Sequence, residues 1–333
     1  MMNFLFDYGM FLAKSLTVAV CLLLVIAGAA ASRRHRDDDD DDDKMRIRLL
    51  NEHFEQQRER LNAELLDKKT LKAQRKAEKK AAKHESAQHR PRIFVLDFDG
   101  DIEASAVAQL REQISAVIQV AGTEDRVLLR LESSGGLVHA YGLAASQLAR
   151  LRERQIPLVI AVDKVAASGG YMMACLADEL IAAPFAILGS VGVIGALPNF
   201  NELLKQHRIR YEEHTAGEHK RSLTLFGENT EADRQQFRHE LAVTHDLFKN
   251  HIRRYRPQLD IDAIATGETW YGAQAVENHL IDAIGTSDDY ILAHLHSHQL
   301  VQLEEHVPER WLDKIKHRFL GKIQARPLKA RIR

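Results

Sequence analysis

The stretch that decides the fold is Asp163-Lys-Val-Ala-Ala-Ser-Gly-Gly-Tyr171, a turn of small residues. An apolar run typical of a β-strand, residues 158–162, leads into this turn, and a run typical of a helix, residues 171–177, follows it. Ser168 is therefore expected at a helix N-terminus, where free backbone N–H groups stabilise negative charge. Such a turn can present a nucleophilic serine. Serine is also a favoured helix cap, and the stretch alone favours that interpretation.

Strand-like and helix-like runs alternate on both sides of the turn. Strands are expected at residues 93–98, 127–131, 158–162 and 179–182, and helices at residues 104–121, 140–154, 201–207 and 230–256. This alternation predicts an α/β fold with a parallel sheet. The apolar, glycine-containing run 181–198 is expected to be a buried core segment rather than a membrane span. Residues 210–214 could form an edge strand.

A pair of glycines, Gly135-Gly136, follows the strand at residues 127–131. Ligands in parallel sheets bind at the carboxyl ends of the strands, so this pair and Ser168 can share one site. A serine nucleophile needs a general base and an oxyanion hole. The backbone N–H groups of Gly169 and of Gly135 or Gly136 would form the hole, because glycine lets the donor approach the reacting carbonyl closely.

The residues alone do not determine the general base. A histidine base could be His139, His214 or His219, but a chain with 17 histidines makes a nearby one weak evidence. A lysine base must be neutral, so burial must lower its pKa from about 10.4 towards 7–8. Lys220 follows a turn at Gly217 and could fold back over the sheet. Its pattern by itself favours an ordinary surface lysine.

The N-terminal quarter differs from the middle of the chain. Residues 11–31 are mostly apolar, and the uncharged part is near the short end for a spanning helix, so we expect an uncleaved membrane anchor rather than a cleaved signal peptide. A charged segment follows, and its pattern predicts an exposed helix or loose coil that ends near Pro91. Its aspartate run, residues 37–43, is expected to be a solvated spacer rather than a calcium site.

These changes in composition predict four parts: an anchor, a charged stalk, a catalytic domain and a basic amphipathic tail, at residues 1–32, 33–91, 92–300 and 301–333. The tail could lie on a membrane surface, pack on a neighbouring subunit or be unstructured. A net charge of −1 gives no reason to expect a nucleic-acid partner. The two cysteines, Cys21 and Cys175, form neither a disulfide framework nor a zinc pattern, and we expect no metal and no cofactor.

Five motifs occur in order along the chain. They are Glu132-Ser-Ser-Gly-Gly136, Asp163 to Tyr171, Gly189-Ser-Val-Gly-Val-Ile-Gly195, Gly217-Glu-His-Lys220, and Trp270-Tyr-Gly272 through Leu280-Ile-Asp282. This ordered series resembles the signal peptide peptidase A family, peptidase family S49, and the resemblance covers almost the whole chain. Any one of the motifs alone would be weak.

The resemblance implies a ClpP/crotonase-like fold with a Ser-Lys dyad, in which Ser168 is the nucleophile and Lys220 is the general base. It also implies an oxyanion hole at Gly169 and at Gly135-Gly136. Related enzymes assemble into membrane-tethered homo-oligomeric rings, in which the serine and the lysine can come from neighbouring subunits.

Two positions depart from the family pattern. Ser134 stands where a proline is usual, and His219 stands where an aromatic residue is common, which keeps a histidine base among the alternatives. The membrane side is also left open. The cluster Arg33-Arg34-His35-Arg36 places the bulk of the chain in the cytoplasm by the positive-inside rule, whereas the resemblance implies the opposite side.

The leading hypothesis is a serine endopeptidase of the bacterial inner membrane that cleaves extended peptide segments. A crotonase-like acyl-CoA hydratase or isomerase would use the same two-amide oxyanion hole, but nothing in the chain resembles a site for the phosphates of CoA. A catalytically silent membrane scaffold, assembled through the long helix and the stalk, is the non-enzymatic alternative.

Overall fold

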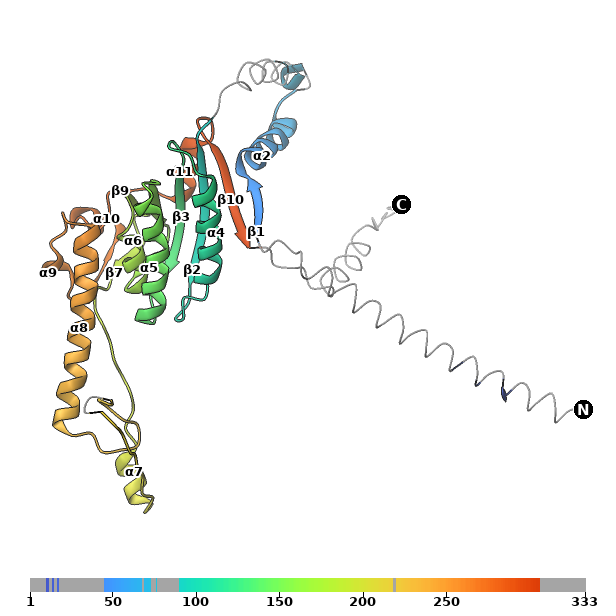
Figure 1. Ribbon diagram of the computed structural model, residues 1–333. Helices are drawn as coiled ribbons and strands as arrows, with labels where there is room; N and C mark the ends of the chain where they lie inside the picture. The colour runs from blue at the N-terminus through green and yellow to red at the C-terminus, as the bar shows by residue number, and fades with distance from the viewer. Residues whose placement is uncertain are drawn as a thin grey trace, which may run out of the picture. The chain divides into compact units, whose positions relative to one another are not determined.

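A computed structural model describes residues 10–11, 14, 17, 45–67, 69–72, 76, 90–217 and 220–305. Within these residues the chain forms a ten-stranded sheet with the main order β1-β10-β2-β3-β4-β6-β9 (Figure 1). These strands are β1 Met45–Leu49, β10 Gln299–Glu305, β2 Arg92–Gly100, β3 Arg126–Ser133, β4 Leu158–Val162, β6 Glu179–Ala182 and β9 Ala283–Ile284. Every pairing from β10 to β9 along this path is parallel.

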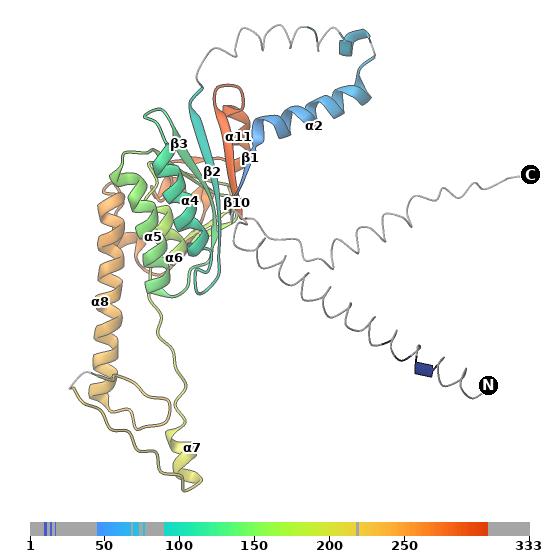
Figure 2. The same ribbon diagram turned by 45° about the vertical axis from the view of Figure 1, so that its right-hand side comes forward.

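Helices cover both faces of the sheet, which explains why the central strands are almost continuously apolar. On one face lie α4, α5 and α6, which span Val107–Val120, Val138–Glu153 and Gly169–Ala174 (Figures 1 and 2). On the other face, Tyr290 and Ile291 of α11 (Ser287–His294) join a core cluster with Ile93 and Val95 of β2. Successive side chains of β2 therefore pack into the apolar cores on opposite faces of the sheet.

A second branch of the sheet carries the turn that contains Ser168. The strands β5 Val165–Ala167, β7 Ile187–Gly189 and β8 Thr269–Tyr271 form this branch. β5 is parallel to β7 and also pairs with the end of β3, through Ser133 and Ala166. β7 pairs with β8 in the antiparallel sense. The branch therefore brings the end of β3 beside the start of α6.

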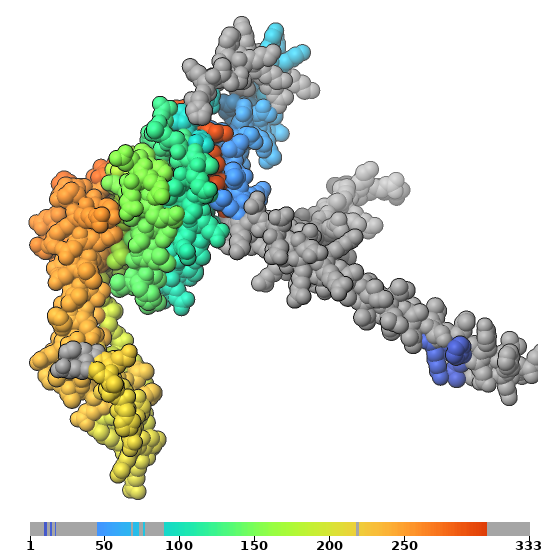
Figure 3. All heavy atoms as spheres, in the orientation of Figure 1, coloured from blue at the N-terminus to red at the C-terminus, as the bar shows by residue number. Residues whose placement is uncertain are grey.

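The longest helix, α8 (Glu231–Tyr255), runs from an extended arm to the sheet. A reciprocal capping box between Thr230 and Asp233 starts it. Near its other end, His251 lies within hydrogen-bond distance of the carbonyl oxygen of Met172 in α6, at 2.9 Å. We call residues 199–230 the arm; it contains the short helix α7 (Asn201–Gln206) and is the yellow part of Figure 3, next to the orange α8.

Most of the predicted elements are present, so the expected α/β fold with a mostly parallel sheet is confirmed. The four expected strands and the four expected helices occur within a few residues of the predicted bounds. The helix after the decisive turn starts at Gly169 rather than at Tyr171. Two shorter elements, α9 (Ile261–Ile264) and α10 (Gly272–Glu277), complete the region after α8.

Three local predictions are wrong. Residues 210–214 form no strand; the ring of Tyr211 packs on that of Phe226, with centroids 5.8 Å apart, so this segment is held by side chains instead of a ladder. Met45–Leu49 is a strand beside β10, although an exposed helix or coil was expected there. The run 181–198 is only partly buried, since Leu188 and Val191 are 0% exposed, whereas Phe185 is 85% and Ile194 is 93% exposed.

Several predicted segments lie outside the described residues. These are nearly all of the anchor at 11–31, the aspartate run at 37–43, most of the basic half of the stalk, and residues 306–333 of the tail. Among the helices that the structure describes, none combines the length and the apolar character that crossing a membrane requires.

An ion pair between a buried arginine and a partly exposed carboxylate holds the end of α8, and its loss should destabilise the fold. Arg256 is 2% exposed and makes two bonds to the Asp282 carboxylate, at 2.8 and 2.9 Å. Arg256→Met removes two charge-assisted hydrogen bonds to a carboxylate that water can still reach, so we expect the free energy of unfolding to fall by about 2 kcal/mol. Urea unfolding followed by circular dichroism measures this. Arg253→Met, which breaks an exposed pair with Asp262, is the matched control and should change stability little; equal effects would contradict the prediction.

Candidate active site

Ser168 occupies a strained backbone conformation between β5 and α6. Its φ is 52° and its ψ is −117°, a combination that side-chain-bearing residues rarely adopt and that costs roughly 1–3 kcal/mol. Its N–H donates to the carbonyl oxygen of Gly189 at 2.8 Å, and its own carbonyl accepts from the N–H of Met172 at 3.0 Å. Strain of this kind is typical of a nucleophile held on a sharp strand-to-helix turn.

The hydroxyl of Ser168 does not cap the helix. Ser168 occupies the N-cap position, as the sequence predicts, but its side chain accepts no capping hydrogen bond, and it makes no hydrogen bond to any residue that the structure describes. The side chain is half-buried rather than enclosed. Its oxygen is therefore available for chemistry, and the simpler cap interpretation accounts only for its position.

Gly135 lies directly against the serine turn. A Cβ atom at Gly135 would be 2.7 Å from Ser168 Cβ and 2.7 Å from the backbone nitrogen of Gly169, and the φ of Gly135 is +87°. Only glycine fits both the space and the backbone conformation. The structure thus brings together Ser168, Gly169 and the Gly135-Gly136 loop, which the sequence analysis assigns to one site.

The two glycines of the loop have different hydrogen bonds. The N–H of Gly135 donates to Ser133 Oγ at 3.0 Å. The N–H groups of Gly136 and Gly169 have no acceptor among the described residues. The following residue is also fixed, because the N–H of Leu137 donates to the carbonyl oxygen of Ile102 at 2.8 Å. Of the donors that the sequence predicts, Gly136 and Gly169 are therefore the two that remain available to an oxyanion.

Lys220 lies on the arm, and its side chain is exposed. Its backbone N–H donates to the carbonyl of Gly217 at 3.2 Å, while its ammonium group makes no hydrogen bond or ion pair with a described residue. Ser222, two residues later, donates to Glu240 of α8 at 3.0 Å. Glu240 and His251, the α8 residue that contacts Met172, are eleven residues apart, about 16 Å along the helix axis. No contact joins Lys220 to Ser168 within the described part of this chain.

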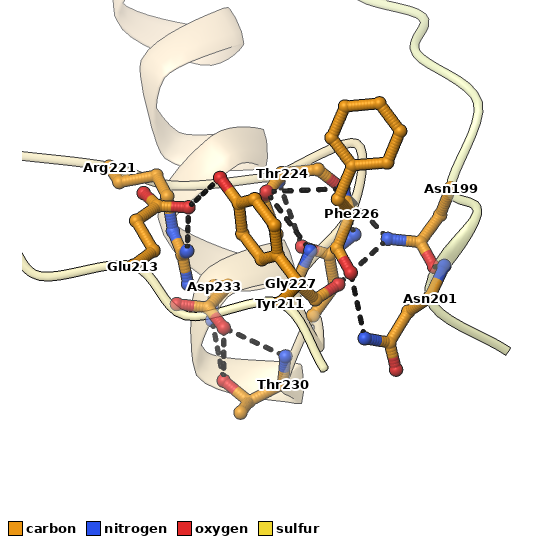
Figure 4. A network of polar contacts seen from close by, with 11 residues as sticks. Asn199, Asn201, Tyr211, Glu213, Arg221, Thr224, Phe226, Gly227, Thr230 and Asp233 are labelled. Atoms are coloured by element: carbon orange, nitrogen blue, oxygen red, sulfur yellow. Dashed lines mark hydrogen bonds and ion pairs between the residues drawn. The ribbon is translucent and has the colours of Figure 1, made fainter. Parts of the chain in front are cut away.

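Polar contacts join segments of the arm on both sides of residues 218–220 (Figure 4). Asn199 donates to the carbonyl oxygens of Thr224 and Gly227, at 2.9 and 3.0 Å. Arg221, next to Lys220, forms an ion pair of 2.7 Å with Glu213. The pKa of the Glu213 carboxyl is below its usual value, chiefly because of the hydrogen bond from Arg221. The loop that carries the lysine is thus built from specific contacts.

Exposure does not distinguish the histidine alternatives from Lys220. His139 and His214 are exposed, and His219 lies outside the described residues. A histidine that the sequence analysis did not single out, His251, lies closer to the serine helix. Its Nε2 is 2.9 Å from the carbonyl oxygen of Met172, and burial lowers its pKa below the usual value. Its position one turn from the buried Phe248 on α8 was the only signal in the sequence.

A groove of about 400 Å³ separates α5 from α8. Its lining includes Val138, Ala145, Met172, Leu247, Phe248 and His251. Val138 directly follows the glycine loop, and Met172 lies one turn after Ser168, so part of this apolar lining belongs to the elements that build the site. The described residues contain no group of histidine, cysteine or acidic side chains suited to hold a metal ion.

Among the described residues, a strained serine whose hydroxyl makes no hydrogen bond lies beside two backbone N–H groups that have no acceptor, at the ends of parallel strands. This is the arrangement of a serine hydrolase. Residues 3–148 match the family model "Peptidase family S49 N-terminal", and residues 150–304 match "Peptidase family S49". The chain belongs to peptidase family S49, and it is a peptidase.

Curated relatives agree with this assignment. The chain is 44% identical to "Probable protease SohB" of Haemophilus influenzae over 94% of this chain and 92% of that protein. It is 52% identical to the protein of the same name from Buchnera aphidicola subsp. Acyrthosiphon pisum over 69% of each chain. It is 46% identical to the "Probable protease SohB" of Buchnera aphidicola subsp. Schizaphis graminum over 88% of this chain and 87% of that protein.

The strain at Ser168 makes a prediction about stability. Ser168→Gly removes both the hydroxyl and the penalty for positive φ, whereas Ser168→Ala removes only the hydroxyl. We expect the glycine variant to be more stable than the alanine variant by about 1 kcal/mol, after the higher entropy of unfolded glycine is allowed for. Denaturant unfolding of both variants measures the difference. An alanine variant as stable as the glycine variant, or more stable, would show that the turn is unstrained.

Proposed function

We propose that this protein is a membrane-anchored serine endopeptidase with a ClpP/crotonase-like fold, in which Ser168 is the nucleophile and Lys220 is the general base. The observation that carries the proposal is the packing of Gly135 against a strained Ser168 whose hydroxyl makes no hydrogen bond to any described residue. Membership of peptidase family S49 supports the reaction class. The proposed substrates are extended segments of peptides or proteins.

The proposed reaction has two halves. Neutral Lys220 takes the proton of Ser168 as Oγ attacks the scissile carbonyl carbon, and the N–H groups of Gly169 and Gly136 hold the oxyanion. The C–N bond then breaks, and the lysine returns the proton to the leaving amine. Water attacks the resulting acyl-enzyme with Lys220 again as the base, which releases the carboxylate and restores Ser168. Each oxyanion donor is typically worth about 10²–10³ in rate.

A neutral lysine requires an apolar environment, because water favours the charged ammonium. The exposed position of Lys220 within one chain therefore supports a homo-oligomer, a ring as in related enzymes, in which the lysine of one copy serves the serine of another. Aromatic side chains on the arm are substantially exposed, with values of 41% for Phe200, 44% for Tyr211 and 40% for Phe226. Burying them against a second copy would provide that environment.

The remaining parts of the chain complete the proposal. Residues 1–32 anchor the protein in the bacterial inner membrane, and residues 33–91 form the stalk, except that β1 at Met45–Leu49 joins the sheet. The catalytic domain runs beyond the predicted boundary at residue 300, because β10 at Gln299–Glu305 pairs with β2, and the basic tail follows β10. The side of the membrane that the catalytic domain faces is open. No observation favours the acyl-CoA enzyme or the silent scaffold over this function.

Alanine substitutions test the dyad directly. Ser168→Ala and Lys220→Ala should each lower kcat for cleavage of an extended fluorogenic peptide by at least about 10³, since nucleophile and base act as one unit. Lys205→Ala changes another exposed lysine of the arm and should leave cleavage intact. Full activity in Lys220→Ala would remove the lysine from the mechanism, and full activity in Ser168→Ala would overturn the proposed function.

Mixing the two inactive variants distinguishes pairing within a subunit from pairing between subunits. Coexpressed Ser168→Ala and Lys220→Ala chains recover activity only where an intact serine of one copy meets an intact lysine of its neighbour. We expect partial recovery, measured as peptide cleavage per mole of intact Ser168. Cleavage no higher than in the separate variants would show that each chain supplies both residues.

Charged residues in the anchor test membrane attachment. Leu23→Arg combined with Val25→Arg places two cations in the apolar run, each costing about 2.5–3.5 kcal/mol at the centre of a spanning helix. We expect the full-length variant to move from the membrane pellet to the alkaline-carbonate supernatant. The pair Leu23→Ala and Val25→Ala is the control and should stay in the pellet. Release of the unmodified protein by carbonate would contradict a spanning anchor.

A further inference from the structure

A chain of hydrogen bonds connects the glycine loop to the protein core through two hydroxyl groups. Gly135 N–H donates to Ser133 Oγ at 3.0 Å, Ser133 Oγ lies 2.5 Å from Tyr141 Oη, and Tyr141 Oη lies 2.7 Å from the carbonyl oxygen of Asp101. A carbonyl oxygen can only accept, so Tyr141 donates to Asp101. The hydroxyl of Ser133 then donates to Tyr141 at 2.5 Å in preference to the carbonyl oxygen of Gly100, which is farther away at 3.4 Å. The chain has a single direction, and each proton in it has an acceptor.

The ring of Tyr141 contacts the other side of the same site. A Cβ atom at Gly169 would lie 2.4 Å from Tyr141 Cγ, so the ring fills the space beneath the residue that follows the serine. Tyr141 is 0% exposed, and its ring meets Phe98 edge to face at 6.4 Å between centroids. The side chain of Tyr141, on the first turn of α5, therefore hydrogen-bonds to Ser133, which accepts from the glycine loop, and also packs against Gly169.

We infer that Tyr141, acting through Ser133, is a positioning residue that sets the distance between the N–H groups of Gly136 and Gly169. The inference rests on the proposed function, because the distance matters only if these two groups bind an oxyanion. The bond from Gly135 to Ser133 fixes the orientation of the loop, which leaves the N–H of Gly136 free. A displacement of about 1 Å at a reacting centre can cost as much as 10² in rate.

The hydroxyl of Tyr141 is the part that distinguishes positioning from core packing. Burial raises the pKa of the Tyr141 phenol above its usual value, so the group keeps its proton across the working pH range. A tyrosine that only fills the core would be replaced by phenylalanine with a change in stability alone. A positioning tyrosine would lose transition-state stabilisation while substrate binding stays the same.

The test compares Tyr141→Phe and Ser133→Ala with the full-length wild-type peptidase. For a cleaved peptide we expect kcat to fall between about tenfold and a hundredfold, with KM unchanged within about twofold. The affinity for a peptide aldehyde, whose adduct with Ser168 carries the oxyanion, should fall by the same factor. The double variant should lose no more than the worse single variant, because both substitutions break one chain.

Tyr290→Phe is the matched control. Tyr290 is also buried, and its hydroxyl lies 3.3 Å from Arg126 away from the glycine loop, so this change should alter neither kcat nor aldehyde affinity. Wild-type kcat and aldehyde affinity in Tyr141→Phe would overturn the inference, as would a rise in KM alone or a loss of thermal stability alone. If Tyr141→Phe does not fold, Ser133→Ala decides by the same criteria.

The same assays separate this inference from the proposed function. Cleavage that persists in Ser168→Ala would overturn the proposed function, and this inference with it. An inactive Ser168→Ala combined with a fully active Tyr141→Phe and Ser133→Ala would overturn the positioning role alone.

Discussion

The hydrogen bond from the N–H of Ser168 to the carbonyl oxygen of Gly189 is the constraint on which the rest of the site depends. It holds a serine at φ 52°, and strain of this size persists only where the surroundings over-determine the backbone. Gly189 is fixed in turn, because its φ is +97° and a Cβ there would lie 2.6 Å from the ring of Trp270. β5, only three residues long, is paired on both sides by β3 and β7. The strands β5, β7 and β8 thus hold the turn that contains Ser168 in its strained conformation.

Sequence patterns predicted the central strands well because their partners cover both faces. β2, β3, β4 and β6 are apolar runs between turn signals. Such a short, continuously apolar run is typical of a parallel strand that is buried on both faces, so it was recognised in the sequence. The strand at Met45–Leu49 was missed because its pattern is charged and its partner is distant: Arg48 pairs with Glu304 at the far end of the described chain. Tyr211 suggested a strand by local preference, but no neighbouring strand is present among the described residues to pair with it.

The site was predictable as a set of residues but not as a set of bonds. Paired glycines after one strand and a serine after the next converge by topology, and the structure brings Gly135 and Ser168 into contact. Which amide is free cannot be read from spacing, because it depends on whether Ser133 Oγ accepts from Gly135. Tyr141 gave no sequence signal, since its place in α5 looks like any buried helical position. Lys220 was recognised from family resemblance rather than from its surroundings.

The proposed lysine base gives the arm a physical role. An ammonium in water keeps its proton at neutral pH, and the side chain of Lys220 is exposed in the described chain. The arm around it is nevertheless built from specific contacts, including the ion pair of Arg221 with Glu213 and the stacked rings of Phe200 and Phe226. A loop ordered in this way, with apolar rings left open, is suited to rigid docking, because little ordering entropy remains to be lost on contact. Under the proposed mechanism the same contact that buries these rings would desolvate Lys220. Assembly and the activation of the base would then be one event, and a separated subunit would carry a preformed nucleophile and oxyanion loop without its base.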